Sequence, residues 1–97
     1  MPQNDQDRRR ANRVKFEMRA PLSTDSGRRE LIEDSWTIDI SALGVRLRLR
    51  GQVVPGQIVI VFLNQHPEQC RVVWTNQTGG TKQLIAGLEF TRPLPDE

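Results

Sequence analysis

Two short stretches of the sequence carry residue types that can bind a charged ligand. The first, RRRANR at residues 8–13, places four arginines in six positions, with Arg9 and Arg13 four residues apart. A guanidinium can hold a phosphate through two parallel hydrogen bonds, donate to O6 and N7 of a guanine, or stack on the base. The pattern therefore favours a ligand that combines phosphates with guanines, and it is equally the composition of a solvated basic tail.

The second stretch is DISALG at residues 39–44. Asp39 falls on the polar side of a predicted strand, where a carboxylate can accept hydrogen bonds from N1–H and the N2 amine of guanine. Ser41 follows two residues later, so both side chains point the same way along a strand. Gly44 permits a tight turn or the close approach of a ligand. Taken alone, this stretch describes only a β-turn.

The basic residues are mostly arginine, with 12 Arg against 2 Lys. Arginine is favoured over lysine where a planar group must bind a phosphate, a carboxylate or a guanine edge through two hydrogen bonds. A genome-wide bias toward arginine codons is the alternative explanation of the same ratio. Residues 1–20 hold six basic and three acidic side chains, a net charge of +3, in a chain whose net charge is +2. The positive end is therefore the N-terminal arm together with the start of the domain.

The sequence offers little for catalysis, and we expect no enzyme. His66 is the only histidine, and it lies in the polar stretch NQHPEQ, which predicts an exposed turn. Cys70, the only cysteine, alternates with Val72 and Trp74 and is predicted to be a small core residue. One cysteine excludes an internal disulfide and a cysteine-rich zinc site, and no glycine-rich phosphate loop precedes a helix. We therefore expect no metal and no cofactor.

The elements that must position these residues are strands. Apolar and polar residues alternate from residue 13 onward, which predicts six or seven short strands and no amphipathic helix. The pattern is typical of an all-β antiparallel barrel or sandwich. Expected strands cover 14–20, 36–40, 45–50, 58–63, 70–74 and 84–90, with turns at 53–57, 66–69 and 76–82. Residues 23–34 are expected to form a polar loop with a weakly helical or strand-like middle at Leu31 and Ile32.

The alternation also predicts which side chains face the core. Val45, Leu47 and Leu49 are expected inside, with the arginines of VRLRLR outside. The same reasoning places Trp36 with Ile38 and Ile40, and Trp74 with Cys70 and Val72, so that both tryptophans are expected in the core; the alternative is that one of them borders the ligand. Gly87, within the last strand, predicts a bulge or a close backbone approach.

The composition suggests three parts: a flexible arginine-rich arm at 1–12, a domain at 13–92 and a short tail at 93–97. The N-terminus lacks the apolar run of a signal peptide. The longest apolar run, IVIVFL at 58–63, is far too short to span a membrane. We therefore expect a cytoplasmic protein without membrane insertion.

Together, the two stretches resemble the signature of the PilZ domain family. That signature is Arg-x-x-x-Arg in an N-terminal segment followed by [Asp/Asn]-x-Ser-x-x-Gly leading into the next strand. Here the first element is 9–13 and the second is 39–44. The later segments PGQIVIVF, CRVVWT and AGLEF also resemble strands of the family, so the resemblance covers residues 8–92.

The resemblance implies a bacterial, six-stranded antiparallel β-barrel that binds the second messenger cyclic di-GMP. It implies that Arg9 and Arg13 clamp the nucleotide from the arm. In the family, an arginine just before the motif tends to accompany binding of two intercalated ligands, which makes Arg8 a further candidate contact. Arg10 is a weaker candidate, and Arg46 is one only through its proximity in sequence.

The resemblance further implies that Asp39 and Ser41 hydrogen-bond a guanine and that Gly44 keeps the turn open. Binding would order the arm against the barrel, and the new surface would signal to an unknown partner protein. One alternative is a degenerate member of the family, a scaffold that binds protein partners without nucleotide. Another is a small RNA- or DNA-binding barrel, which we do not expect because no strand shows a row of exposed aromatic residues.

Overall fold

The computed structural model describes residues 13–26, 28–77 and 82–92. Within these ranges the chain forms strands and turns and contains no helix, in agreement with the alternation in the sequence. The predicted arm at 1–12, with Arg8 and Arg9, lies outside the described residues, as does the predicted tail at 93–97.

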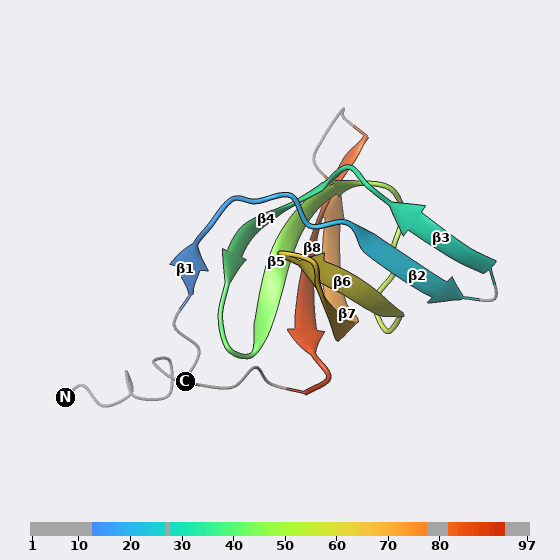
Figure 1. Ribbon diagram of the computed structural model, residues 1–97. Helices are drawn as coiled ribbons and strands as arrows, with labels where there is room; N and C mark the ends of the chain where they lie inside the picture. Colours follow the sequence, from blue (N-terminus) through green and yellow to red (C-terminus); the bar gives the residue numbers. More distant parts are fainter. Residues whose placement is uncertain (1–12, 27, 78–81, 93–97) are drawn as a thin grey trace.

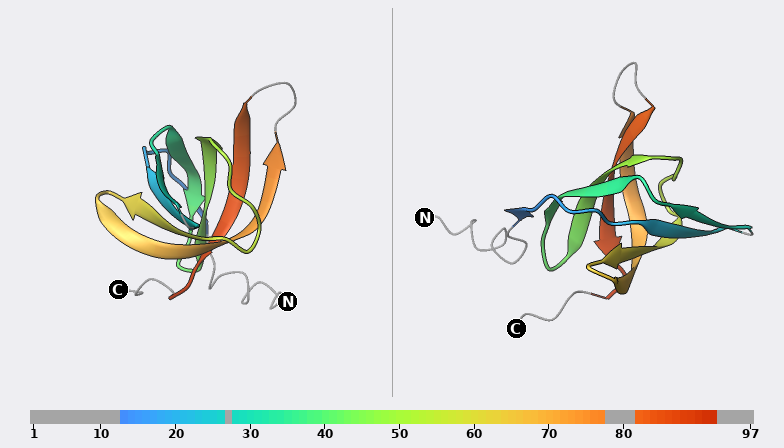
Figure 2. Two further views of the ribbon diagram at one scale, coloured as in Figure 1. Left: turned by 90° about the vertical axis from the view of Figure 1, so that its right-hand side faces the viewer. Right: turned by 45° about the horizontal axis from the view of Figure 1, so that its top comes forward.

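The strands form one antiparallel sheet that curls into a partly closed barrel (Figures 1 and 2). Their order is β1-β4-β5-β8-β7-β6-β2-β3. The long strand β7 pairs with β8 on one side and with β6 on the other. The all-β antiparallel fold is confirmed, with eight strands among the described residues instead of six. They are β1 (Val14–Lys15), β2 (Leu22–Ser26), β3 (Arg28–Ile32), β4 (Ser35–Ile40), β5 (Gly44–Arg50), β6 (Ile58–Leu63), β7 (His66–Gln77) and β8 (Gln83–Phe90).

The segment expected to be a polar loop at 23–34 is instead mostly the β2–β3 hairpin, which projects from the sheet in Figure 1. Leu22 and Thr24 are buried and pair with Val61 and Val59 of β6. Their spacing of two places both side chains on the covered face of the hairpin. The polar residues around them concealed this alternation, so the prediction of a loop was wrong, whereas the strand-like alternative at Leu31 and Ile32 falls within β3.

The turn between β6 and β7 also differs from the expectation. It is made by Asn64 and Gln65, both with positive φ (53° and 72°), as in a two-residue type I′ hairpin. The segment 66–69, predicted as the turn, is already part of β7, where His66 pairs with Leu63. His66 is exposed, as expected.

The core lies on the inner face of the curled sheet. Cys70 is fully buried there, and burial is the main cause that raises the pKa of its thiol to about 12, so it is a core residue with an inert thiol at neutral pH. The buried apolar side chains are Ala20, Leu22, Ile32, Val45, Leu47, Leu49, Val53, Val59, Val61, Leu63, Cys70, Val72, Leu84, Ala86, Leu88 and Phe90.

A bulge in β4 changes the face that its residues present. Trp36 pairs with Arg48 and Thr37 with Leu47, but Asp39 pairs with Arg46, which leaves Ile38 as an extra residue. Paired residues in an antiparallel ladder share a face. Trp36 therefore lies with the outward Arg48 and is 39% exposed, so its predicted place in the core was wrong.

A second bulge does the same in β7. Val72 pairs with Leu88 and Trp74 with Gly87, which leaves Val73 without a partner. Trp74 is turned to the outer face, is 39% exposed and is not a core residue as predicted. A Cβ added to Gly87 would overlap its indole. Of the two alternatives predicted for Gly87, a bulge is present opposite it in β7, whereas the group that approaches it is a side chain and not a backbone segment.

Candidate ligand-binding site

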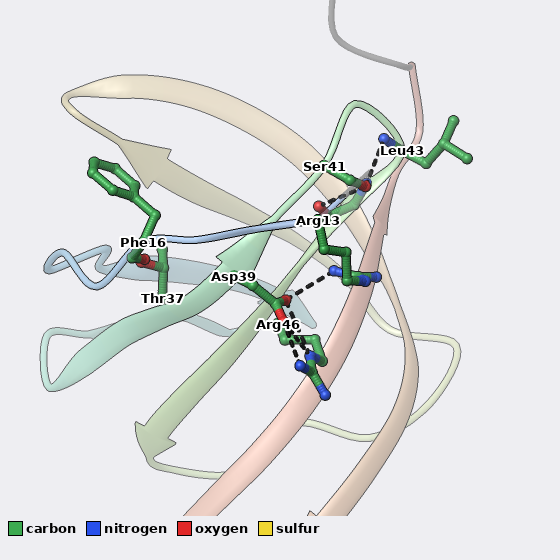
Figure 3. A network of polar contacts seen from close by, with 8 residues as sticks. Arg13, Phe16, Thr37, Asp39, Ser41, Leu43 and Arg46 are labelled. Atoms are coloured by element: carbon green, nitrogen blue, oxygen red, sulfur yellow. Dashed lines mark hydrogen bonds and ion pairs between the residues drawn. The ribbon is translucent and has the colours of Figure 1, made fainter. Parts of the chain in front are cut away.

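A buried hydroxyl ties the segment leading out of β1 to β4. The Thr37 Oγ1 donates to the Phe16 carbonyl and accepts the Met18 N–H at 2.9 Å. Further along, Val14 pairs with Ile40 and Lys15 with Asp39. These contacts fix the path of the chain, so that the preceding residue, Arg13, lies over the end of β4 (Figure 3).

Asp39 is the centre of the polar network in Figure 3. Its Oδ1 accepts a hydrogen bond from Arg13 Nη1 at 2.9 Å. The Nε of Arg46 donates to both carboxylate oxygens at 3.0 Å, and its Nη2 donates to Oδ2. The Asp39 side chain is only 4% exposed, against 44% for Arg13 and 39% for Arg46. Two half-exposed guanidinium groups therefore cover one carboxylate.

The charges of this network stabilise one another. The hydrogen bond from Arg46 is the largest cause that lowers the pKa of Asp39, opposed by desolvation and supported by the charge of Arg13. The same hydrogen bond raises the pKa of Arg46. Charge-assisted bonds favour the ionised form of both partners. Asp39 is consequently an anion at neutral pH although it is almost fully covered.

Ser41 and Gly44 build the turn that follows. The Ser41 Oγ accepts hydrogen bonds from the N–H groups of Leu43 at 3.1 Å and Gly44 at 3.3 Å. The Ser41 N–H donates to the Gly44 carbonyl at 2.9 Å. A Cβ on Gly44 would overlap the Leu88 carbonyl oxygen. Glycine at position 44 therefore allows β5 to approach β8, and the serine hydroxyl stabilises the turn.

Trp74 lies on the same face as the charged cluster. Arg46 pairs with Gly87 of β8, and Gly87 pairs with Trp74 of β7. Asp39, Arg46, Gly87 and Trp74 thus form one row across four neighbouring strands. Because Gly87 has no side chain, the indole lies over β8 toward Arg46. This row presents a carboxylate, a guanidinium and an aromatic ring.

The structure brings together two of the predicted site residues, Arg13 and Asp39, and places Ser41 and Gly44 in the adjoining turn. Sequence reasoning named Arg46 only through its proximity in sequence. The sequence did contain a signal for this contact. The arginines of VRLRLR were predicted to point outward, and Asp39 was predicted on the polar side of the preceding strand, so one of these arginines could pair with it.

Sequence reasoning also missed the outward position of Trp74. The sequence contains one indication of it. A glycine in the last strand, Gly87, has no side chain, so it leaves room for the ring of a tryptophan paired with it on the neighbouring strand.

The described residues contain no group of three or more His, Cys, Asp or Glu side chains placed to hold a metal ion. Among them, no helix is long and apolar enough to cross a membrane.

Comparison with known families gives one match. The family model described as PilZ domain matches residues 7–97, which includes every described strand and both stretches singled out in the sequence. No match was found among curated proteins.

Proposed function

Because the chain belongs to the PilZ domain family, which in general consists of cyclic di-GMP receptors, we propose that this protein binds cyclic di-GMP beside Asp39. The observation that carries the proposal is the cluster of one covered carboxylate and two half-exposed guanidinium groups on the outer face. The cluster contains partners for each polar part of the ligand, which is a dianion with two guanine bases. The proposed activity is that of a receptor and not of an enzyme.

Arg13 is the group that we expect to change partner on binding. It is held to Asp39 by one hydrogen bond, and its side chain is 44% exposed. A phosphate of the ligand can accept two parallel hydrogen bonds from the Arg13 guanidinium. A guanine N–H then takes its place on Asp39, so the carboxylate exchanges one donor for another.

Trp74 provides the aromatic surface of the proposed site. Its indole lies over Gly87, next to Arg46 in the same row. Base stacking on an aromatic side chain contributes about 1–3 kcal/mol per base. A guanine hydrogen-bonded at the Asp39 end of the row can therefore stack toward β7.

The proposal includes the preceding arginines as arm contacts. Arg9 lies four residues before Arg13, so an extended chain keeps it within about 14 Å of Arg13. Arg8 adds a further cation that can stack on a second, intercalated nucleotide. In this proposal Ser41 and Gly44 border the bound guanine, with Ser41 also holding the turn.

Signalling is proposed to follow from ordering of the arm. Ordering residues 1–12 costs conformational entropy, which charge-assisted hydrogen bonds of about 1.5–3 kcal/mol each offset. The resulting surface would be read by a partner protein. A nucleotide messenger acts inside the cell, so the proposal includes a location in the bacterial cytoplasm.

The test is isothermal titration of cyclic di-GMP into the wild-type protein and an Arg13→Ala variant. We expect saturable heat from the wild type and about 10-fold to more than 100-fold weaker binding by the variant. Arg19→Ala is the matched control, since Arg19 is an exposed arginine whose side chain contacts Glu33, with Nε 3.4 Å from the carbonyl oxygen and Nη2 3.9 Å from the carboxylate, and does not contact Asp39. Amide exchange of residues 1–13 should slow when ligand is added.

Two outcomes would contradict parts of this proposal. A wild-type protein that gives no heat at physiological salt would belong to the class of scaffolds that bind protein without nucleotide. Binding without any change in amide exchange of residues 1–13 would remove the signalling step and leave the receptor. The stoichiometry separates one bound nucleotide from the pair suggested by Arg8.

A further inference from the structure

Arg46 makes the most extensive contact with Asp39, and neither of the two sequence stretches contains it. Its Nε bonds both carboxylate oxygens at 3.0 Å, and its Nη2 bonds Oδ2. The two residues are paired directly across β4 and β5. Among the described residues, no acceptor is bonded to Arg46 Nη1, and the side chain is 39% exposed. Arg46 therefore keeps a free donor on the outer face.

The two arginines on Asp39 are held with unequal strength. Arg13 makes one hydrogen bond and precedes a strand of two residues at the edge of the sheet. Arg46 makes three contacts and comes from β5, which is paired on both sides. A ligand that reaches Asp39 therefore displaces Arg13 and leaves the Asp39–Arg46 pair in place.

Without Arg13, the pair presents an acceptor beside a donor. The acceptor is Asp39 Oδ1, and the donors are the outer N–H groups of Arg46. Guanine carries the complementary edge, with the O6 acceptor next to the N1–H and N2 donors. Adenine carries an N6 donor where guanine has O6, which would meet the Arg46 donors. The same pair thus attracts one purine and repels the other.

We propose that Arg46 is a specificity-determining residue: it fixes the Asp39 carboxylate and donates to guanine O6, so that this site prefers guanine to adenine. This inference rests on the proposed function, because it concerns the base of the ligand that binds beside Asp39. It adds a residue on β5 to those that the two sequence stretches supply.

Arg48 offers a matched control. It lies two residues further along β5 and points to the same outer face, where it bonds the exposed Glu17 at 2.8 Å. It pairs with Trp36 and not with Asp39. Replacing Arg48 removes the same charge from the same face and leaves the Asp39–Arg46 pair intact.

The experiment measures the affinities of cyclic di-GMP and cyclic di-AMP for wild type, Arg46→Ala, Arg46→Lys and Arg48→Ala. The two nucleotides have the same backbone and charge, so their affinity ratio reports the base alone. Loss of Arg46 should weaken cyclic di-GMP binding and reduce the ratio, each by about tenfold or more. Arg46→Lys should give an intermediate ratio because it keeps the charge without the planar fork. Arg48→Ala should leave the ratio unchanged.

A ratio that stays unchanged in Arg46→Ala would overturn the inference, and so would tighter binding, which would mean that Arg46 blocks Asp39. If thermal unfolding shows that Arg46→Ala does not fold, Arg46→Lys decides by the same ratio. A wild-type protein that binds neither nucleotide overturns the proposed function and this inference together. Wild-type binding with an unchanged ratio in the variants overturns this inference alone.

Discussion

Burial and hydrogen bonding have opposite effects on the charge of the Asp39 carboxylate. Desolvation penalises its charge, while two guanidinium groups supply four short contacts to its two oxygens. A buried ion pair is favourable only when its geometry satisfies the groups removed from water. Removing Arg46 would therefore leave the charge of Asp39 with Arg13 as its one cationic partner among the described residues, which makes the pair a structural feature as well as part of the proposed binding surface.

The lowered pKa of Asp39 predicts how stability depends on pH. Its folded pKa lies below the unfolded value of 3.8, chiefly because Arg46 bonds it. The stability that it contributes is present above the unfolded pKa and is lost as the pH falls through the folded pKa. Urea unfolding should show the wild type losing more stability below about pH 4 than Asp39→Asn. Glu33→Gln is the control for loss of an exposed carboxylate, and equal slopes in wild type and Asp39→Asn would refute the prediction.

Among the elements, the two bulges decide which side chains lie on the outer face and which face the core. In β5, without a bulge, the alternation in the sequence predicts the faces correctly, with Val45, Leu47 and Leu49 inside. In β4 and β7 one extra residue reverses the alternation partway along the strand. A bulge is a property of two paired strands, so one strand's own pattern cannot predict it.

The same limit applies to the candidate site. The sequence identifies Arg13 and Asp39 by residue type, but they are 26 positions apart in the sequence and meet through the pairing of β1 with β4 and the contacts of Thr37. Arg46 becomes a partner through the β4–β5 register, and Trp74 reaches the outer face through the second bulge. Fold class and motif residues are therefore predictable from the sequence, whereas the contacts depend on register.

Two glycines of the β5–β8–β7 region should respond differently to alanine. Gly44→Ala drives a Cβ into the Leu88 carbonyl and should cost about 1–3 kcal/mol of unfolding free energy, because two strands must separate. Gly87→Ala meets only the half-exposed Trp74 indole, which can move aside. We expect a smaller stability loss and a shifted tryptophan emission, measured in a Trp36→Phe background. A larger stability loss at Gly87 than at Gly44 would contradict this account.

The described part of the molecule has two faces with separate tasks. The inner face of the curled sheet, whose curvature is seen in Figure 2, holds the core, and the outer face holds Trp74 and the Asp39 cluster, the latter drawn in Figure 3. Apart from the Asp39–Arg46 pair, substitutions of outward side chains should therefore disturb folding less than substitutions in the core. Cys70 belongs wholly to the inner face and can report on the integrity of the whole sheet.

We expect Cys70 to react with a thiol reagent only when the sheet opens. It is fully buried, and its pKa of about 12 leaves almost no thiolate at neutral pH. The labelling rate should rise with urea in parallel with the unfolded fraction and fall when a ligand stabilises the folded state. Rapid labelling of the native protein, at a rate close to that of the urea-unfolded chain, would contradict this prediction.

The extra residue Ile38 allows two residues of opposite parity to share one side of β4. Trp36 and Asp39 are three positions apart, yet both lie on the outer face because Ile38 stands unpaired between them. If the same residues paired regularly after Thr37, Asp39 would lie opposite the buried Val45 and its carboxylate would be directed at the core. The outward position of this charge is therefore encoded by a count of residues that neither motif contains. A homologous chain with both motifs but with regular pairing at this point would keep the motif residues and lose the outward carboxylate.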